Sequence, residues 1–171
     1  MIGLADLTNA MVTTLQAIPE LIAMLIDPSY IEPYIDLHPD ANSYSAAIYG
    51  MTPGSIMVAH IETILESTET MSMWEHTLHI LVKAGTGLSA LDIVNTIVDG
   101  IPVPGDGLPW RYCPIMDGLL PSEITDIVRE TDAEGIDYHE IIVKIAETGD
   151  YFNNGQRRSS PRRTTAARKR R

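Results

Sequence analysis

The chain has little cysteine, few aromatic residues and almost no positive charge outside its last fifteen positions. Cys113 is the only cysteine among 171 residues, which excludes an intrachain disulfide and favours synthesis in a reducing compartment. We expect its thiol to be buried and inert. Aromatic residues make up 6% of the chain and Phe152 is the only phenylalanine, so a core must consist of aliphatic side chains and methionine.

The sequence also lacks a long apolar run. No segment approaches the ~20 apolar residues that a membrane-spanning helix requires. Asp6 and Glu20 interrupt the first apolar region, and no charged segment precedes it as in a signal peptide. We therefore expect a soluble protein that does not bind membranes and is intracellular when made.

Positive charge gathers at one end of the sequence. Eight of the twelve basic residues are Arg157, Arg158, Arg162, Arg163, Arg168, Lys169, Arg170 and Arg171. The formal charge of −11 therefore combines a body near −19 with an arm of +8. Residues 156–171 contain no apolar residue larger than Ala, so burial cannot offset the entropy lost on ordering them. The pattern predicts one domain over residues 1–150 and a disordered, basic C-terminal arm over 151–171.

The basic arm has three interpretations. It neutralises phosphates without sequence specificity, it binds an acidic protein surface such as the body of a neighbouring copy, or it only keeps the protein soluble. The arginine-rich stretch 156–171 contains no aromatic residue on which bases could stack, which argues against recognition of single strands. An acidic body repels nucleic acid, which argues against DNA binding as the main activity.

The first half of the domain begins with helical spacing. Apolar residues spaced by threes and fours predict an amphipathic helix over residues 3–26. Pro19 predicts a kink there, or a second short helix with this proline at its first position. Residues 27–54 are rich in proline and predict an irregular surface or interface segment, with short extended pieces around 31–37 and 45–49.

Two β-hairpins and a helix are predicted in the rest of the domain. Residues 55–66 and 74–84 form the first hairpin, since they are rich in β-branched residues and joined by a short polar linker. One face of its second strand carries Trp74, Leu78, Ile80 and Val82, and the other carries Glu75, Thr77, His79 and Lys83. A helix over 88–99 follows, with Thr86 or Ser89 as its cap and Gly100 and Pro102 at its end.

The second hairpin is expected after a loop over residues 101–121. Residues 124–130 and 136–147 form its strands, with Gly135 in the turn. Ser122 could instead cap a helix over the first of these segments, but we favour a strand. The fold class is therefore α+β, with an antiparallel or mixed sheet and flanking helices.

Few residues form a pattern typical of chemistry. His76 and His79 are three apart in a strand and point to opposite faces, and no second cysteine or HExxH motif provides a zinc site. The stretch GTGLSALD (85–92) lacks the Lys-Ser/Thr pair of a phosphate-binding loop. Weaker candidates are a calcium-like turn at Asp132, Glu134 and Asp137, loop carboxylates at Asp99, Asp106 and Asp117, and a dyad of Cys113 with His139 or His79. We predict no catalytic residue, cofactor or metal.

The order of elements resembles a known family of virion proteins. The stretches PELIAML, GSIMVAHIET, MWEHTLHILVKA, ALDIVNTIVDGIP and DYHEIIVKIAET resemble those of tail terminator proteins of long-tailed, siphovirus-type bacteriophages, especially phages of actinobacterial hosts. The resemblance covers residues 3–148. It implies an α+β subunit that forms a homohexameric ring on the head-proximal end of the tail tube. It further implies a non-enzymatic virion protein at the head–tail junction, assembled in the host cytoplasm.

The resemblance also implies the partners of such a ring. These are the tail tube protein, the head–tail connector or stopper protein, and genomic DNA that passes without specific binding through an acidic lumen. The length of residues 27–54 and the basic arm depart from the family, and we expect the arm to lie outside the lumen. Alternatives are another neck component such as a head-closure protein, a DNA-binding regulator that acts through the arm, and, least favoured, an enzyme.

Overall fold

A computed structural model describes residues 3–25, 27–35, 41–67, 72–83, 85, 89–101, 122–131 and 134–147. In chain order its elements are α1 (Leu4–Gln16), α2 (Pro19–Met24), the 3-10 helix η1 (Pro28–Tyr30), β1 (Ile31–Tyr34), α3 (Ala41–Gly50), β2 (Ile56–Ser67), β3 (Ser72–Lys83), α4 (Ala90–Gly100), β4 (Glu123–Thr131) and β5 (Asp137–Glu147). Among these residues, no helix is long and apolar enough to cross a bilayer.

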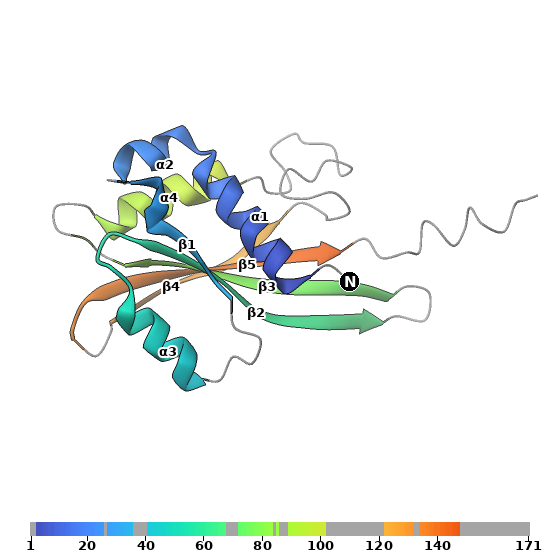
Figure 1. Ribbon diagram of the computed structural model, residues 1–171. Coiled ribbons are helices and arrows are strands. Elements are labelled where there is room, and N and C mark those ends of the chain that lie inside the picture. Colours follow the sequence, from blue (N-terminus) through green and yellow to red (C-terminus); the bar gives the residue numbers. More distant parts are fainter. Residues whose placement is uncertain are drawn as a thin grey trace, which may run out of the picture.

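The strands form one mixed sheet in the order β1-β2-β3-β5-β4. The short edge strand β1 runs parallel to β2, and every other neighbouring pair is antiparallel. Figure 1 shows α1, α2 and α4 on one side of this sheet and α3 on the other. We call these sides the first face and the second face. The fold confirms the predicted α+β class.

Both predicted hairpins are present. Strands β2 and β3 pair from Ile56 with Val82 to Ser67 with Ser72, and β4 pairs with β5. Gly135 lies in the second turn with φ 80°, a conformation that costs glycine little because it has no Cβ. The strand interpretation of residues 124–130 is therefore confirmed over the helical alternative.

The first face holds the main core. Alternate aliphatic residues of the strands, including Ile56, Leu78 and Ile80, pack against α1, α2 and α4. Pro19 occupies the first turn of α2, where its missing N–H would have no partner within the helix. Of the two interpretations of residues 3–26, the structure therefore confirms the second short helix.

The second face carries a smaller core beneath α3. Ile48 and Met51 from α3 and the residue after it pack against Met57, Ala59 and Leu81 of the sheet. The expectation of an extended piece around residues 45–49 is wrong, because these residues belong to α3. The neighbouring extended piece is confirmed as β1, although it ends at Tyr34.

Helix α4 begins and ends close to the predicted positions. Ser89 occupies its N-cap position without a side-chain hydrogen bond to the helix, and the last helical residue is Gly100. Gly85, the first residue of GTGLSALD, lies against Gly54, and a Cβ on Gly85 would lie 2.9 Å from the Gly54 Cα. Close backbone packing therefore explains this glycine without a phosphate. The loop 102–121, Thr86 and the arm lie outside the described residues.

Candidate assembly surfaces

The second face of the sheet is strongly acidic. Among the side chains that the structure describes, the strand register places seven carboxylates on it, those of Glu32, Glu62, Glu75, Glu123, Asp126, Glu130 and Glu140. Two lysines of the described part share that face. Lys83 is buried and donates to the backbone oxygens of Ile48 and Tyr49 at 3.4 and 3.1 Å, and Lys144 pairs with Glu75 at 2.5 Å. Both lysines thus already have partners within the subunit. Most of the carboxylates on the second face have no neighbouring lysine on the same face.

A tyrosine, a histidine and a glutamate meet where α3 lies on this face. Tyr44 donates its hydroxyl hydrogen to Glu140 Oε1 at 2.9 Å, and His79 Nδ1 lies 2.6 Å from the same oxygen. The hydrogen bond from His79 lowers the pKa of Glu140, although burial opposes this shift. Burial, followed by the charge of Glu140, raises the pKa of the Tyr44 phenol. Glu140 is therefore an ionised acceptor that ties α3 to strands β3 and β5.

A second polar network lies at the far end of the first face. His76 is fully buried, and its Nε2 lies 3.0 Å from Glu147 Oε2. The Thr63 hydroxyl lies 2.9 Å from His76 Nδ1 and 3.0 Å from His60 Nε2. Burial, with the nearby His76, lowers the pKa of His60 to about 4, so this ring is neutral at pH 7. A hydroxyl has one hydrogen, so Thr63 donates to one ring and accepts from the other.

Both networks join residues that lie far apart in the sequence. The prediction that His76 and His79 point to opposite faces is confirmed, since one contacts Glu147 and the other Glu140. In the calcium-like turn, Asp137 accepts from Arg129 and Thr131, and Glu134 accepts from Tyr49. Within the described part of the chain, no group of three or more His, Cys, Asp or Glu residues could hold a metal ion.

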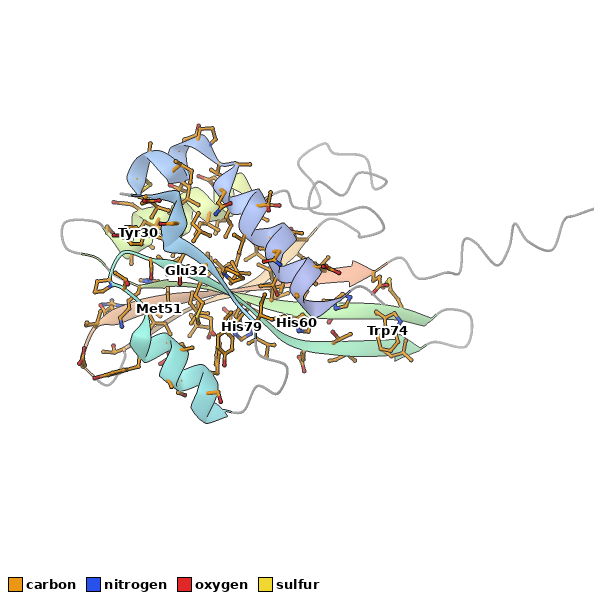
Figure 2. The ribbon with its side chains drawn as sticks, in the orientation of Figure 1. Tyr30, Glu32, Met51, His60, Trp74 and His79 are labelled. Carbon is orange, nitrogen blue, oxygen red and sulfur yellow. The ribbon has the colours of Figure 1, made fainter. Side chains whose placement is uncertain are left out.

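The hairpin of β2 and β3 carries apolar side chains near its free end. Ile64 and Leu65 are 43% and 49% exposed and point to opposite faces, and Trp74 pairs with Leu65 across the strands. Figure 2 shows Trp74 near the free end of the hairpin, far from Tyr30 and Met51. We call Ile64, Leu65 and Trp74 the hairpin tip. Adjacent exposed apolar side chains of this kind are typical of protein contacts.

A hollow of about 310 Å³ lies at the opposite end of β2. Tyr30, Glu32 and Met51 mark it in Figure 2, on η1, on β1 and just after α3. Its full lining is Ser29, Tyr30, Glu32, Pro33, Tyr34, Ala47, Gly50, Met51, Thr52, Ser55, Ile56 and Met57. The predicted surface segment 27–54 therefore forms most of a concave surface.

Few of the remaining sequence candidates lie among the described residues. His139 and His79 lie on opposite faces, and Cys113, Asp106, Asp117, Asp132 and all eight basic arm residues lie outside the described residues. Within the described residues, His139 Nδ1 is buried without a hydrogen-bond partner. Burial lowers its pKa, and the Arg129 charge adds to this effect. Sequence reasoning missed Glu140, Tyr44 and Glu147, because each contacts a histidine far away in the chain.

Comparison with solved structures shows a likeness to a virion protein. The fold is similar to that of a chain in the virion of a native gene transfer agent (GTA) particle, with a TM-score of 0.52 and 15% sequence identity. The alignment covers 86% of this chain and 98% of that chain. No protein-family model matches the sequence, and no curated protein matches it. At this identity the likeness establishes a shared fold.

Proposed function

We propose that this protein is a structural virion protein, a tail terminator that forms a ring on the head-proximal end of a tail tube. The observation that carries this proposal is the likeness to nearly the whole length of a chain from a gene transfer agent virion. It agrees with the resemblance of residues 3–148 to tail terminator proteins, which rests on the sequence. The ring joins the tube to the head connector and stops tube growth.

The positions of the hairpin tip and the hollow support a ring. They lie at opposite ends of β2, and Ile56 and Leu65 are roughly 30 Å apart along an extended strand. Contact between the tip of one copy and the hollow of the next would be head-to-tail. Repeated contacts of this kind close into a ring when the rotation between copies allows it.

The acidic second face supports passage of DNA. Carboxylates on a ring lumen repel phosphates, so DNA would move through without lasting contacts. In this arrangement the second face points toward the lumen, and the first face, with its helices, lies outside.

Deletion of the gene from a particle-producing genome tests the proposal. We expect filled heads without tails, together with free tails whose tubes are longer than normal, as seen by electron microscopy of lysates. Free tails of normal length would instead favour a head-closure protein. Intact particles with joined tails of normal length would contradict both functions.

A further inference from the structure

The polar network at the far end of the first face is a continuous line of contacts from the surface into the interior. It begins at the partly exposed His60, whose Nε2 lies 3.0 Å from Thr63 Oγ1. The same oxygen lies 2.9 Å from Nδ1 of His76, a residue that is fully buried. On the other side of that ring, Nε2 lies 3.0 Å from Glu147 Oε2. Strands β2, β3 and β5 therefore contribute to a single chain of hydrogen bonds.

The contacts fix the positions of the hydrogens when both rings are neutral. A carboxylate only accepts, so the ring hydrogen of His76 lies on Nε2 and points to Glu147. Nδ1 of His76 then has a free lone pair and accepts from the Thr63 hydroxyl. The Thr63 oxygen in turn accepts from Nε2 of His60, which therefore carries the hydrogen of that ring. Every hydrogen in the line points from His60 toward Glu147.

One added proton fits into this line without the loss of a hydrogen bond. A proton from water binds Nδ1 of His60, and the hydrogen on Nε2 of that ring passes to the Thr63 oxygen. Thr63 gives its original hydrogen to Nδ1 of His76. His60 is then neutral again, as the other tautomer, and His76 is a cation beside the Glu147 carboxylate. All three hydrogen bonds remain, and the two at Thr63 have reversed direction.

We propose that this line is a binding site for one proton, which enters at His60 and is held on His76 by Glu147. A hydrogen bond between a charged ring and a carboxylate is stronger than one between neutral groups, so the buried pair favours the charged form of His76. A second proton is opposed for two reasons. It would leave the Thr63 hydrogen without an acceptor, and it would place two charged rings with their centres 5.7 Å apart. Burial, with the nearby His76, also lowers the pKa of His60 to about 4, which agrees with this limit.

The surroundings leave Glu147 as the described carboxylate that is placed to hold this proton. Helix α1 packs on β2, and its one charged residue, Asp6, is exposed. The other titratable residues on the first face of β5 are Asp137 and His139, and eight residues of extended strand put His139 ~26 Å from Glu147. The described first-face residues of β2 and β3 include no titratable side chain beyond the two histidines of the line. The inference concerns a single chain and does not depend on the proposed ring.

NMR of the ring nitrogens tests the site in the full-length protein, because it distinguishes the two neutral tautomers of histidine from the charged ring. His60→Gln and His76→Gln assign the two sets of signals. Between about pH 9 and pH 5, a range that includes the usual titration of histidine, we expect His76 to gain one proton. Over the same interval the hydrogen of His60 should move from Nε2 to Nδ1. A His60 hydrogen that does not move as His76 gains its proton, a His60 ring that becomes charged first, or a His76 ring that does not titrate would overturn the proposal.

Two variants of Thr63 test whether its hydroxyl transmits the proton. Thr63→Val replaces the hydroxyl with a methyl group, and Thr63→Ser retains the hydroxyl as the matched control. We expect the tautomer of His60 to follow the charge of His76 in Thr63→Ser, as in the parent protein, and to stop following it in Thr63→Val. Equal behaviour of the two variants would contradict transfer through Thr63. If Thr63→Val does not fold, the titrations of the parent protein and of Thr63→Ser still decide whether the two rings change together.

Discussion

The first face of the sheet is covered by three helices and is apolar at its centre, whereas the second face is covered by one helix and carries seven carboxylates among the described side chains. The same strands form both faces, so successive residues along each strand point alternately to the first face and to the second face. Inward residues of the first face stabilise the subunit. Residues of the second face, together with the hairpin tip and the hollow, are available for contacts with other molecules.

The largest expected difference between the faces is in core stability. Leu78 on the first face and Leu81 on the second are both fully buried, but Leu78 belongs to the larger cluster. We expect Leu78→Ala to lower the free energy of unfolding by about 4 kcal/mol and Leu81→Ala by about 3 kcal/mol, because a smaller cluster relaxes more easily around a cavity. Denaturant titration measures both. A larger loss for Leu81→Ala would reverse the comparison.

The two histidine–glutamate pairs give the next largest difference. Glu147→Ala removes the carboxylate that pairs with the fully buried His76, and we expect the free energy of unfolding to fall by about 3 kcal/mol. Glu140→Ala acts on a partly exposed pair on the second face, and we expect about 1–2 kcal/mol. Thermal unfolding at pH 7 compares the two variants. Equal losses of stability in the two variants would show that the difference in burial does not change how much each pair contributes to stability.

A pH titration sharpens the comparison further. His60 has a folded pKa of about 4, below its ordinary value of 6.5, so the unfolded chain binds the extra proton between these values. Its contribution to stability is therefore fully present above pH 6.5 and is lost as the pH falls toward 4. We expect His60→Gln to flatten the pH dependence of the unfolding midpoint between pH 6.5 and 4. An unchanged slope would contradict a neutral, buried His60.

Glu140 on the second face titrates in a lower range. Its folded pKa lies below the ordinary 4.5, so its stabilising effect is present above that pH and is lost as the pH falls through the folded value. Glu140→Gln should remove the loss of stability that protonation of Glu140 causes at low pH. It should leave the loss of stability that protonation of His60 causes unchanged. A loss of pH dependence above pH 5 in this variant would show that the two networks are coupled.

The smallest expected change in stability concerns the hairpin tip. Leu65→Asp should alter the free energy of unfolding by less than about 0.5 kcal/mol, because the side chain is half exposed. The same change should abolish association between copies. Leu91→Asp is the control, since Leu91 is similarly exposed on α4. Light scattering reports the association, and equal effects of the two variants would contradict a specific role for the tip.

Much of the fold follows from short-range patterns. The β-branched residues of 55–66 and 74–84 and their short polar linker predict the first hairpin, and Gly135 predicts the turn of the second, because these signals depend on neighbours in the chain. Pro19 likewise marks the start of α2. Helix α3 was missed, since the prolines and tyrosines around it predict irregular structure and its burial depends on contacts with β2 and β3.

The surfaces could not be predicted in the same way. The acidic second face depends on strand register and on the order β3-β5-β4, which brings Glu123 and Asp126 beside Lys144 and Ile142. The pair His76–Glu147 joins residues 71 positions apart. The hollow requires η1, β1 and α3 to meet, and no local motif in residues 27–54 specifies that meeting.

The most direct test of the account is the mass of the purified full-length protein in solution, measured with and without isolated tail tubes. The account predicts a ring of six copies, or a monomer that forms such a ring only on tube ends. Electron microscopy of the same samples would show the ring and its position. A monomer that ignores tube ends and binds DNA in a salt-dependent manner through residues 157–171 would contradict the account and favour a DNA-binding regulator.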